Sequence, residues 1–336
     1  MNTAGADVGL APAPRLLRGL ASARLTLVLL SLLAAAVIAH TRLADGAPAL
    51  LSAAFALCAM NLAAALAAHP RLRADLPLFV FHAALLAMLL LLAAGRLLYF
   101  QGTVELARGE LFDGQLTSRA AGLLHADRLS RLRFVNDGFT VNYAEGWQRG
   151  NTRNEIRLFG EDGGVRHYTI GDIDPLVADG YRFYTTSNKG YAPVFRWVPR
   201  DGRPMERGTV HLPSYPLNEH RQSQTWRLPG TAREVWVMLD LDRPAIDPTR
   251  AAEFALPEKH RLIVVVDNAR REMVAGESIV LPDGVLVYEG LTTWMGYRIF
   301  YDPTLPWMLA ASLAGILSLA AFFWRRFGRL ARRVAS

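Results

Sequence analysis

The sequence predicts a membrane protein that combines α and β structure: four transmembrane helices, with one large, mostly β extracytoplasmic domain between the third helix and the fourth. Three observations predict this fold class. Four long apolar stretches interrupt a chain of 336 residues that is 51% hydrophobic. Arginines collect beside some ends of these stretches and not beside others. Residues 100–303 alternate polar and apolar side chains between glycine and aspartate turns, which is typical of β-strands.

The apolar stretches have lengths that suit membrane-spanning helices. They are Leu25–Ala39, Pro48–Ala68, Pro77–Gly95 and Pro306–Phe323. The third has no charged side chain, and at about 1.5 Å per residue it extends roughly 28 Å, close to the ~30 Å hydrocarbon core of a bilayer. The first, which lengthens by including His40 and Thr41, has flanks like those of a secretory signal peptide. Because two more spans follow at once, we expect an uncleaved signal-anchor.

The arginines predict the orientation of the spans. Three of them precede the first span, two lie between the second and the third, and five follow the fourth. Because Lys and Arg collect in cytoplasmic flanks, we expect both termini in the cytoplasm. The predicted division is a cytoplasmic tail (1–24), a three-helix transmembrane segment (25–99), an extracytoplasmic β-rich domain (100–303), a fourth transmembrane helix (304–324) and a basic cytoplasmic tail (325–336).

Charge and cysteine content exclude several classes of protein. The net charge is +7, yet residues 99–302 hold nearly equal numbers of basic and acidic side chains. The basic surplus lies beside the spans, so it indicates topology in a lipid bilayer and no binding of nucleic acid. The single cysteine, Cys58, lies in the second span. The outer domain therefore has no internal disulfide, no c-type haem attachment motif and no thiolate zinc site.

The outer domain is predicted to be a β-sandwich or an open barrel. Ten segments have the composition of strands: 139–143, 155–159, 165–170, 181–186, 192–198, 209–212, 234–241, 261–267, 278–281 and 285–290. Turns are expected at 161–164, 201–203 and 282–284, where Asp and Gly occur together. Short helices are expected within 108–134 and 250–258. A last strand, 292–303, leads directly into the fourth span.

One titratable residue interrupts the third span. His82 lies about five residues after Pro77, roughly 8 Å into the apolar core. An ionisable side chain at this depth is expensive unless it has a partner, so it is a candidate functional residue. Neutral imidazole is a good iron ligand. The alternative is a histidine that is hydrogen-bonded to a neighbouring helix, with Asn61 as one possible partner.

Several segments, taken in order, resemble the ResB family of System II cytochrome c biogenesis. RLTLVLLSLLAAAVIAHT is similar to the family's opening span, and FVFHAALLAMLLLLAAG to its third span, where a histidine precedes a leucine-rich run that ends in glycine. VRHYTIGDIDPLVADGYRFYTTSN is similar to a strand–turn–strand segment of the family. GLTTWMGYRIFYDPTLPWMLAASLAG is similar to its closing strand and final span. The resemblance extends over the whole chain.

The resemblance implies a function, a cofactor and partners. The family works with a ResC/CcsA-type membrane protein, whose tryptophan-rich haem-binding signature is absent from this chain. Haem is expected to cross the bilayer with one intramembrane histidine from each protein as an axial ligand of the iron, and only His82 matches that position here. Transient haem, shared with the partner, would then reach apocytochrome c. The resemblance also implies a multi-pass protein of the bacterial inner membrane with a periplasmic domain and no catalytic step of its own.

Two other classes of function stay open beside this one. In the first, the β domain is a docking or chaperone platform, and the helices are a membrane anchor without a cofactor. In the second, the outer domain is an enzyme. The sequence has no G-x-S-x-G, H-E-x-x-H, P-loop or G-x-G-x-x-G in the required context, and Asp172 and Asp174 lie in a turn beside Pro175. No catalytic residue is therefore predicted.

The remaining histidines and the mid-span Asn61 have structural explanations. Asn61 is expected to hydrogen-bond to a neighbouring helix. His40 is expected at the outer membrane interface, and His69 at the cytoplasmic end, where it is a candidate for accepting haem. Solvated or strand-face histidines are expected at the five positions of the outer domain: His125, His167, His211, His220 and His260.

An aromatic cluster lies just before the last span. Two hypotheses apply to Trp294, Tyr297, Phe300 and Tyr301: an apolar platform for a porphyrin edge or a partner, or an ordinary β-core that ends in an aromatic belt. Arg298 pairs with a haem propionate under the first hypothesis and forms a surface salt bridge under the second. Another aromatic group is expected to be core: Tyr181, Phe183 and Tyr184.

Overall fold

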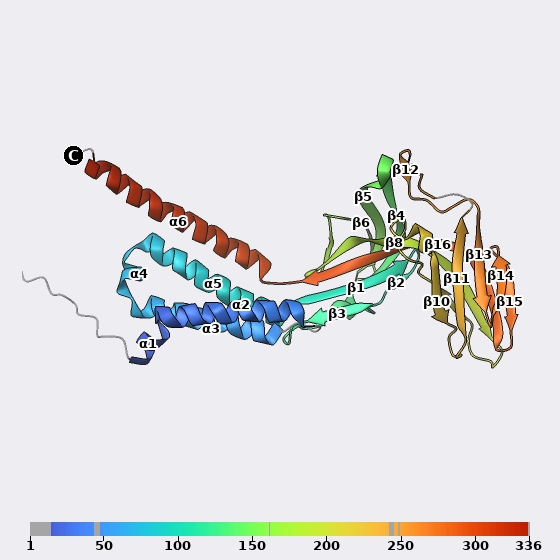
Figure 1. Ribbon diagram of the computed structural model, residues 1–336, viewed down its shortest axis with the longest axis horizontal. Coiled ribbons are helices and arrows are strands. Elements are labelled where there is room, and N and C mark those ends of the chain that lie inside the picture. Colours follow the sequence, from blue (N-terminus) through green and yellow to red (C-terminus); the bar gives the residue numbers. More distant parts are fainter. Residues whose placement is uncertain (1–14, 44–47, 161, 242–244, 248, 335–336) are drawn as a thin grey trace, which may run out of the picture. The chain divides into compact units, whose positions relative to one another are not determined.

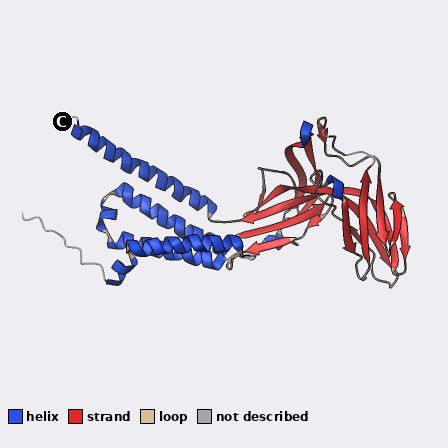
Figure 2. Cartoon of the chain, in the orientation of Figure 1, coloured by secondary structure: helices blue, strands red, loops and turns tan. Residues whose placement is uncertain are grey.

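The computed structural model describes residues 15–43, 48–160, 162–241, 245–247 and 249–334 (Figure 1). The chain divides into two compact units. The helical unit holds the described residues up to Phe100, the segment Ala120–Ala126 and the residues from Asp302 onward. The strand unit holds Gln101–Arg119 and Asp127–Tyr301. Figure 2 shows that the long helices belong to the first unit and the sheets to the second.

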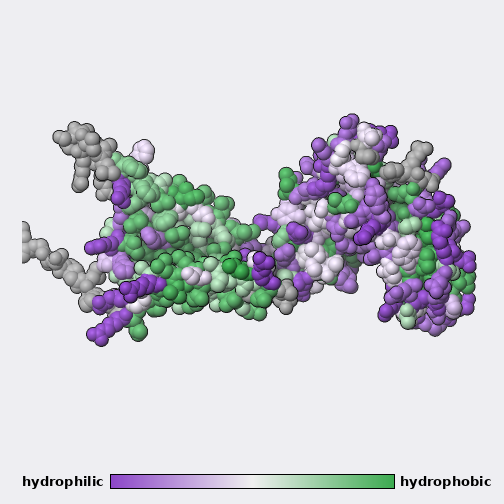
Figure 3. All heavy atoms as spheres, in the orientation of Figure 1, coloured by the Kyte–Doolittle hydropathy of each residue, from purple (hydrophilic) through white to green (hydrophobic). Residues whose placement is uncertain are grey.

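The described part of the helical unit contains six α-helices. They are α1 (Arg15–Leu20), α2 (Ala23–Arg42), α3 (Pro48–Ala68), α4 (Pro70–Ala74), α5 (Leu76–Leu98) and α6 (Leu305–Val334). Four helical segments are long and apolar enough to cross a membrane: Ala23–Arg42, Pro48–Ala68, Leu76–Leu98 and Leu305–Phe327. Apolar side chains dominate their visible surface in Figure 3. These four helices confirm the predicted transmembrane helices and indicate a multi-pass membrane protein.

Helix α3 is the most enclosed of the four spans. In its apolar window 44% of the residues are buried, against 11% to 17% in the other three. Its sequence is rich in alanine, and small side chains let neighbouring helices approach closely. This helix therefore packs inside the bundle.

Prolines and glycines position α5 and α6. Pro77 stands in the first turn of α5, where its missing N–H costs no hydrogen bond. A Cβ on Gly95 would lie 3.0 Å from the Thr304 hydroxyl, and one on Gly315 would lie 3.5 Å from Cβ of Ala84. Glycine at both positions lets α6 approach α5 closely. Helix α6 continues to Val334, so the described part of the predicted tail 325–336 is helical.

The strand unit contains three antiparallel sheets, which confirms the predicted, largely β domain. The seven-stranded sheet has the order β3-β1-β16-β8-β7, with β15 paired to β16 and β9 to β8. The five-stranded sheet has the order β12-β4-β5-β6, with β2 paired to β4, and the four-stranded sheet has the order β10-β11-β13-β14. The strands are β1 (Phe100–Ala107), β2 (Leu111–Phe112), β3 (Ser118–Ala121), β4 (Arg133–Ala144), β5 (Gln148–Phe159), β6 (Val165–Gly171), β7 (Leu176–Ala178), β8 (Tyr181–Pro199), β9 (Glu206–Thr209), β10 (Ser223–Arg227), β11 (Glu234–Leu241), β12 (Ala252–Glu253), β13 (His260–Val266), β14 (Ala269–Met273), β15 (Ser278–Leu281) and β16 (Gly284–Tyr301).

Two long strands form the centre of the seven-stranded sheet. The sequence predicts separate strands at 181–186 and 192–198, but both belong to β8, which pairs with β16 along most of its length. The pairing jumps from Met295–Lys189 to Tyr297–Thr185, so three residues of β8 lie opposite Gly296. A Cβ on Gly296 would lie 2.8 Å from the Asn188 carbonyl oxygen. Only glycine therefore fits opposite this bulge.

The main apolar core lies between the seven-stranded and the four-stranded sheet. It includes fully buried side chains from β8, β11, β13 and β16, among them Tyr191, Val237, Leu262 and Tyr288. Val237 and Tyr288 alternate with less buried positions along β11 and β16, whereas Tyr191 and Leu262 lie in runs of consecutive buried residues. Alternation and short apolar runs together located these strands in the sequence.

The two short α-helices expected in the outer domain are wrong. In 108–134 the chain forms β2, β3 and a single 3-10 turn, Leu129–Arg131, because glycines at 109, 114 and 122 break the helical pattern. In 250–258 the chain forms β12, which pairs with β4 and turns Phe254 into the apolar core. The strand expected at 209–212 is wrong except at Thr209, where β9 ends.

Candidate functional site

His82 lies in the first half of α5, about 9 Å along the helix axis from Leu76. Its side chain is half-buried. The ring of Phe81 packs edge-on against the imidazole, with ring centroids 5.4 Å apart. Helix α5 packs between α3 and α6 in the bundle. The histidine therefore stands on a helix that two other spans hold in place.

A hydrogen bond within α5 fixes the chemistry of this imidazole. Nδ1 of His82 lies 2.7 Å from the carbonyl oxygen of Leu78, one turn earlier. A carbonyl oxygen only accepts hydrogen bonds, so Nδ1 carries the proton and donates it. In the neutral ring Nε2 then bears the lone pair. This is the arrangement of a metal-ligating histidine, whose second nitrogen is oriented by a backbone carbonyl.

Asn61 is not the partner of His82. Its side-chain amide donates to the Leu20 carbonyl at 2.5 Å, and its side-chain oxygen accepts from the Thr26 hydroxyl at 2.7 Å. Both bonds run from α3 to the segment that contains α1 and α2. The expected interhelical hydrogen bond is confirmed, and the alternative in which Asn61 satisfies His82 is wrong.

The other histidines of the helical unit lie at its ends. His40 is half-buried in the last turn of α2, and His69 is exposed immediately before α4. His125 donates from Nδ1 to the Leu98 carbonyl at 3.0 Å, and its ring stacks on Phe100. Within the described residues, no group of three His, Cys, Asp or Glu side chains is arranged to hold a metal ion. Metal ligation here would rest on single histidines.

The histidines of the strand unit have ordinary surroundings. His167 is exposed on β6, and His220 is exposed within the 3-10 turn Glu219–Arg221. His211 stacks on Trp294 and lies 3.3 Å from a carboxylate oxygen of Glu105. Nε2 of His260 is 2.7 Å from the hydroxyl of Tyr288, and burial lowers the pKa of this histidine. These contacts agree with the expected strand-face and solvated histidines.

The aromatic cluster on β16 is mostly core. Trp294 and Tyr297 are buried, and their polar atoms bond to the Leu212 carbonyl and the Asn154 side chain. The platform hypothesis is therefore wrong for these two residues. Phe300 is partly exposed, and Tyr301 packs on Tyr181 with centroids 5.0 Å apart. Two further side chains are placed as expected, with Arg298 exposed and Phe183 buried.

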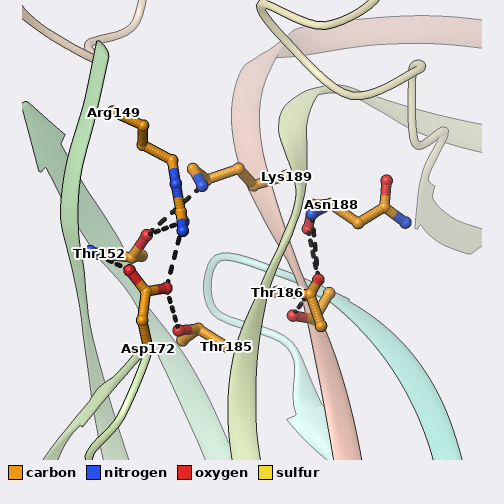
Figure 4. A network of polar contacts seen from close by, with 8 residues as sticks. Arg149, Thr152, Asp172, Thr185, Thr186, Asn188 and Lys189 are labelled. Carbon is orange, nitrogen blue, oxygen red and sulfur yellow. Dashed lines mark hydrogen bonds and ion pairs between the residues drawn. The ribbon is translucent and has the colours of Figure 1, made fainter. Parts of the chain in front are cut away.

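A buried polar network in the strand unit had no counterpart in the sequence prediction (Figure 4). Lys189, only 1% exposed, donates from Nζ to the Thr152 hydroxyl at 3.4 Å. Arg149 donates to the same hydroxyl at 3.0 Å and to Asp172 at 3.1 Å. Asp172 also accepts from the backbone N–H of Thr152 and from the Thr185 hydroxyl. The network thus contains two cations, Arg149 and Lys189, and the single carboxylate of Asp172 can neutralise only one of them.

Burial and charge set the protonation of this network. Burial, together with the nearby Arg149, lowers the pKa of Lys189 to about 8, although Asp172 pulls it upward. For Asp172 burial raises the pKa, but hydrogen bonds from Thr152, Arg149 and Thr185 and the charge of Arg149 outweigh it, so the pKa falls. Because Lys189 has almost no exposed surface, the network favours a structural role in the domain interior.

The bulge opposite Gly296 explains why sequence patterns missed Lys189. Its letters, SNKG at 187–190, suggest a surface loop between two strands. In the structure they belong to β8: Ser187 and Asn188 lie in the bulge, which a bond from the Thr186 hydroxyl to the Gly296 carbonyl holds, and Lys189 pairs with Met295. A lysine two residues before the largely buried run YAPVFRW is a signal, but its partner Thr152 is distant in sequence.

Comparison with known proteins identifies the family. Residues 65–334 match the model of the ResB-like family. The chain belongs to the ResB-like family. This confirms the resemblance seen in the sequence, and the matched residues include α5 with His82, the strand unit and α6.

Other comparisons are more distant. No curated protein matches the chain. Among solved structures, a match to Cytochrome c Heme Lyase CcmF has 15% sequence identity and a TM-score of 0.29, and it covers 90% of this chain and 35% of that one. The chain thus spans about a third of that protein's length. A TM-score of this size does not establish a shared fold.

Proposed function

We propose that this ResB-like protein handles haem in cytochrome c maturation. Nε2 of His82 serves as an axial ligand of haem iron during transfer across the membrane. A ResC/CcsA-type membrane protein supplies the second ligand, and haem passes on to apocytochrome c. Membership of the ResB-like family supports a role in cytochrome c maturation. The hydrogen bond of His82 supports its proposed role as a ligand of haem iron.

The observation on which this proposal depends is the bond from His82 to the Leu78 carbonyl. It holds the proton on Nδ1, so the lone pair of Nε2 is available to a metal. Neutral imidazole is the form that ligates iron. A half-buried side chain can be reached from outside the three packed helices, as a ligand shared with a partner requires.

The location of His82 favours early contact with haem. It lies nearer the end of α5 at Leu76, which follows the arginine-bearing segment Pro70–Ala74, than the end at Leu98. In the orientation that the arginines predict, this is the cytoplasmic half of the bilayer. Haem made in the cytoplasm would then meet His82 first and continue toward the strand unit's side of the membrane.

The test is the absorption spectrum of the protein co-purified with its ResC/CcsA-type partner. We expect a Soret band that is lost or shifted in His82→Ala and is restored when free imidazole is added to the variant. His40→Ala is the matched control, since it removes another half-buried histidine of the bundle, and its spectrum should not change. A Soret band unaffected by His82→Ala would refute the ligand assignment. No band in any preparation would instead favour the platform without a cofactor.

A further inference from the structure

A short segment of the chain leaves the sheets and joins the helical unit. Ala120–Ala126 begins with the last two residues of β3, yet it clusters with the membrane helices, while the residues on both sides belong to the strand unit. Arg119 and Asp127, which flank the segment, form an ion pair with a nitrogen–oxygen distance of 3.0 Å. This pair closes the base of a seven-residue loop, which we call the capping loop.

The capping loop bonds to the end of α5. The last carbonyls of a helix lack partners within it. Here the N–H of Gly122 donates to Tyr99 at 2.9 Å, and the N–H of Leu124 donates to Leu97 at 2.8 Å. Nδ1 of His125 donates to the carbonyl between them, that of Leu98, at 3.0 Å. Three consecutive carbonyls at the end of a membrane-length helix are therefore satisfied by one loop.

The sequence of the loop is adapted to this close approach. A Cβ on Gly122 would lie 2.3 Å from the Leu97 carbonyl oxygen, so no larger residue fits there. With its backbone held against α5, the loop turns two large apolar side chains outward. Leu123 is 73% exposed and Leu124 is 63% exposed. Two adjacent leucines with this much exposed surface need an apolar environment or leave a costly patch in water.

The position of the loop identifies that environment. It is bonded to the last residues of a span of 23 residues, so it lies wherever this span leaves the bilayer. Tyr99 directly follows the span, and Trp307 lies in the first turn of α6, beside Thr304, which packs on Gly95. Aromatic residues of this kind mark the membrane–water interface. Lipid beside this end of the spans is therefore the apolar environment within reach of the leucines.

We propose that the capping loop inserts Leu123 and Leu124 into the lipid bilayer, at the boundary between headgroups and acyl chains beside the end of α5. The ligand is lipid, and the contact is apolar. Because the loop is the part of residues 101–301 that joins the helical unit, it gives the chain between α5 and α6 its own attachment to the membrane. This inference is independent of haem binding.

The experiment uses the full chain in lipid nanodiscs with one environment-sensitive NBD label. Cys58, buried in α3, is replaced by alanine so that a single introduced cysteine is labelled. Label sites are Leu123→Cys and, as a matched control, Leu217→Cys, which is also 73% exposed but lies in the strand unit. Nanodiscs contain phosphatidylcholine with a doxyl quencher near the headgroup or deep in the acyl chain. Far-UV circular dichroism verifies that both variants are folded.

We expect blue-shifted emission from position 123, with stronger quenching by the shallow doxyl lipid than by the deep one. The label at position 217 should emit as in water and show no quenching. Adding Gly122→Val should return the label at 123 toward aqueous emission, because the larger side chain displaces the loop. Aqueous emission at 123 would overturn the proposal. Blue-shifted emission without doxyl quenching would also overturn it, because protein rather than lipid would then cover the leucines.

Discussion

The strand unit has two interiors, one apolar and one that combines apolar with polar side chains. Between the seven-stranded and four-stranded sheets, apolar side chains such as Val237 and Leu262 are fully buried. Between the seven-stranded and five-stranded sheets, Phe134 and Phe183 are buried beside Lys189, Asn154 and Thr152, and hydrogen bonds hold these three polar residues. Both interiors are stabilised by removing apolar surface from water, and the second, here called the polar interior, also depends on its polar atoms keeping their partners.

The largest effect is expected in the apolar interior. Leu262→Ala deletes a fully buried side chain and leaves a cavity, so the free energy of unfolding should fall by about 3 kcal/mol. A urea titration of the full chain in detergent, followed by tryptophan fluorescence, measures this loss. The exposed Val280→Ala on neighbouring β15 is the control and should change stability little. Equal losses from both variants would contradict the division between interior and surface.

The next effect depends on pH and isolates the polar interior. Burial lowers the pKa of Lys189 to about 8, so between pH 8 and 10 the unfolded chain binds more protons at this residue than the folded one. Its contribution to stability therefore rises with pH in that window. Relative to Lys189→Met, the wild type should gain of the order of 2 kcal/mol from pH 8 to pH 10. Identical pH profiles would show that Lys189 is solvated.

The smallest effect removes a single hydrogen bond from the polar interior. Tyr297→Phe deletes the hydroxyl that donates to the Asn154 side-chain oxygen at 2.6 Å. The oxygen then stays buried without this donor, and we expect a loss of roughly 1 to 2 kcal/mol in the same urea titration. Tyr168→Phe, at a partly exposed site on β6, is the control. A neutral Tyr297→Phe would mean that the polar interior tolerates an unpaired acceptor.

The difference between the two interiors also explains which strands could be predicted from the sequence. Period-two alternation located β4 and β11, because one face of each is buried against apolar neighbours. The polar interior lacks that pattern, since Thr152 and Lys189 have the composition of a surface. Their burial depends on contacts between β5 and β8 that are distant in sequence.

Only part of the candidate site could be predicted from the sequence. His82 stood out because a titratable residue in an apolar span is unusual. Its tautomer depends on the bond to the Leu78 carbonyl, and no sequence pattern predicts that bond. Likewise, Trp294 and Tyr297 have the composition of an exposed aromatic platform, but their depth follows from strand pairing in β16.

The bond between His82 and Leu78 also has a consequence for the biogenesis of the protein. A span that enters the bilayer before its neighbours assemble must satisfy its polar groups alone. The Leu78 carbonyl is one turn away on the same helix, so Nδ1 gains its partner as soon as α5 coils. Nδ1 of the imidazole is thus already hydrogen-bonded during insertion, and the lone pair of Nε2 stays available for the ligation proposed above.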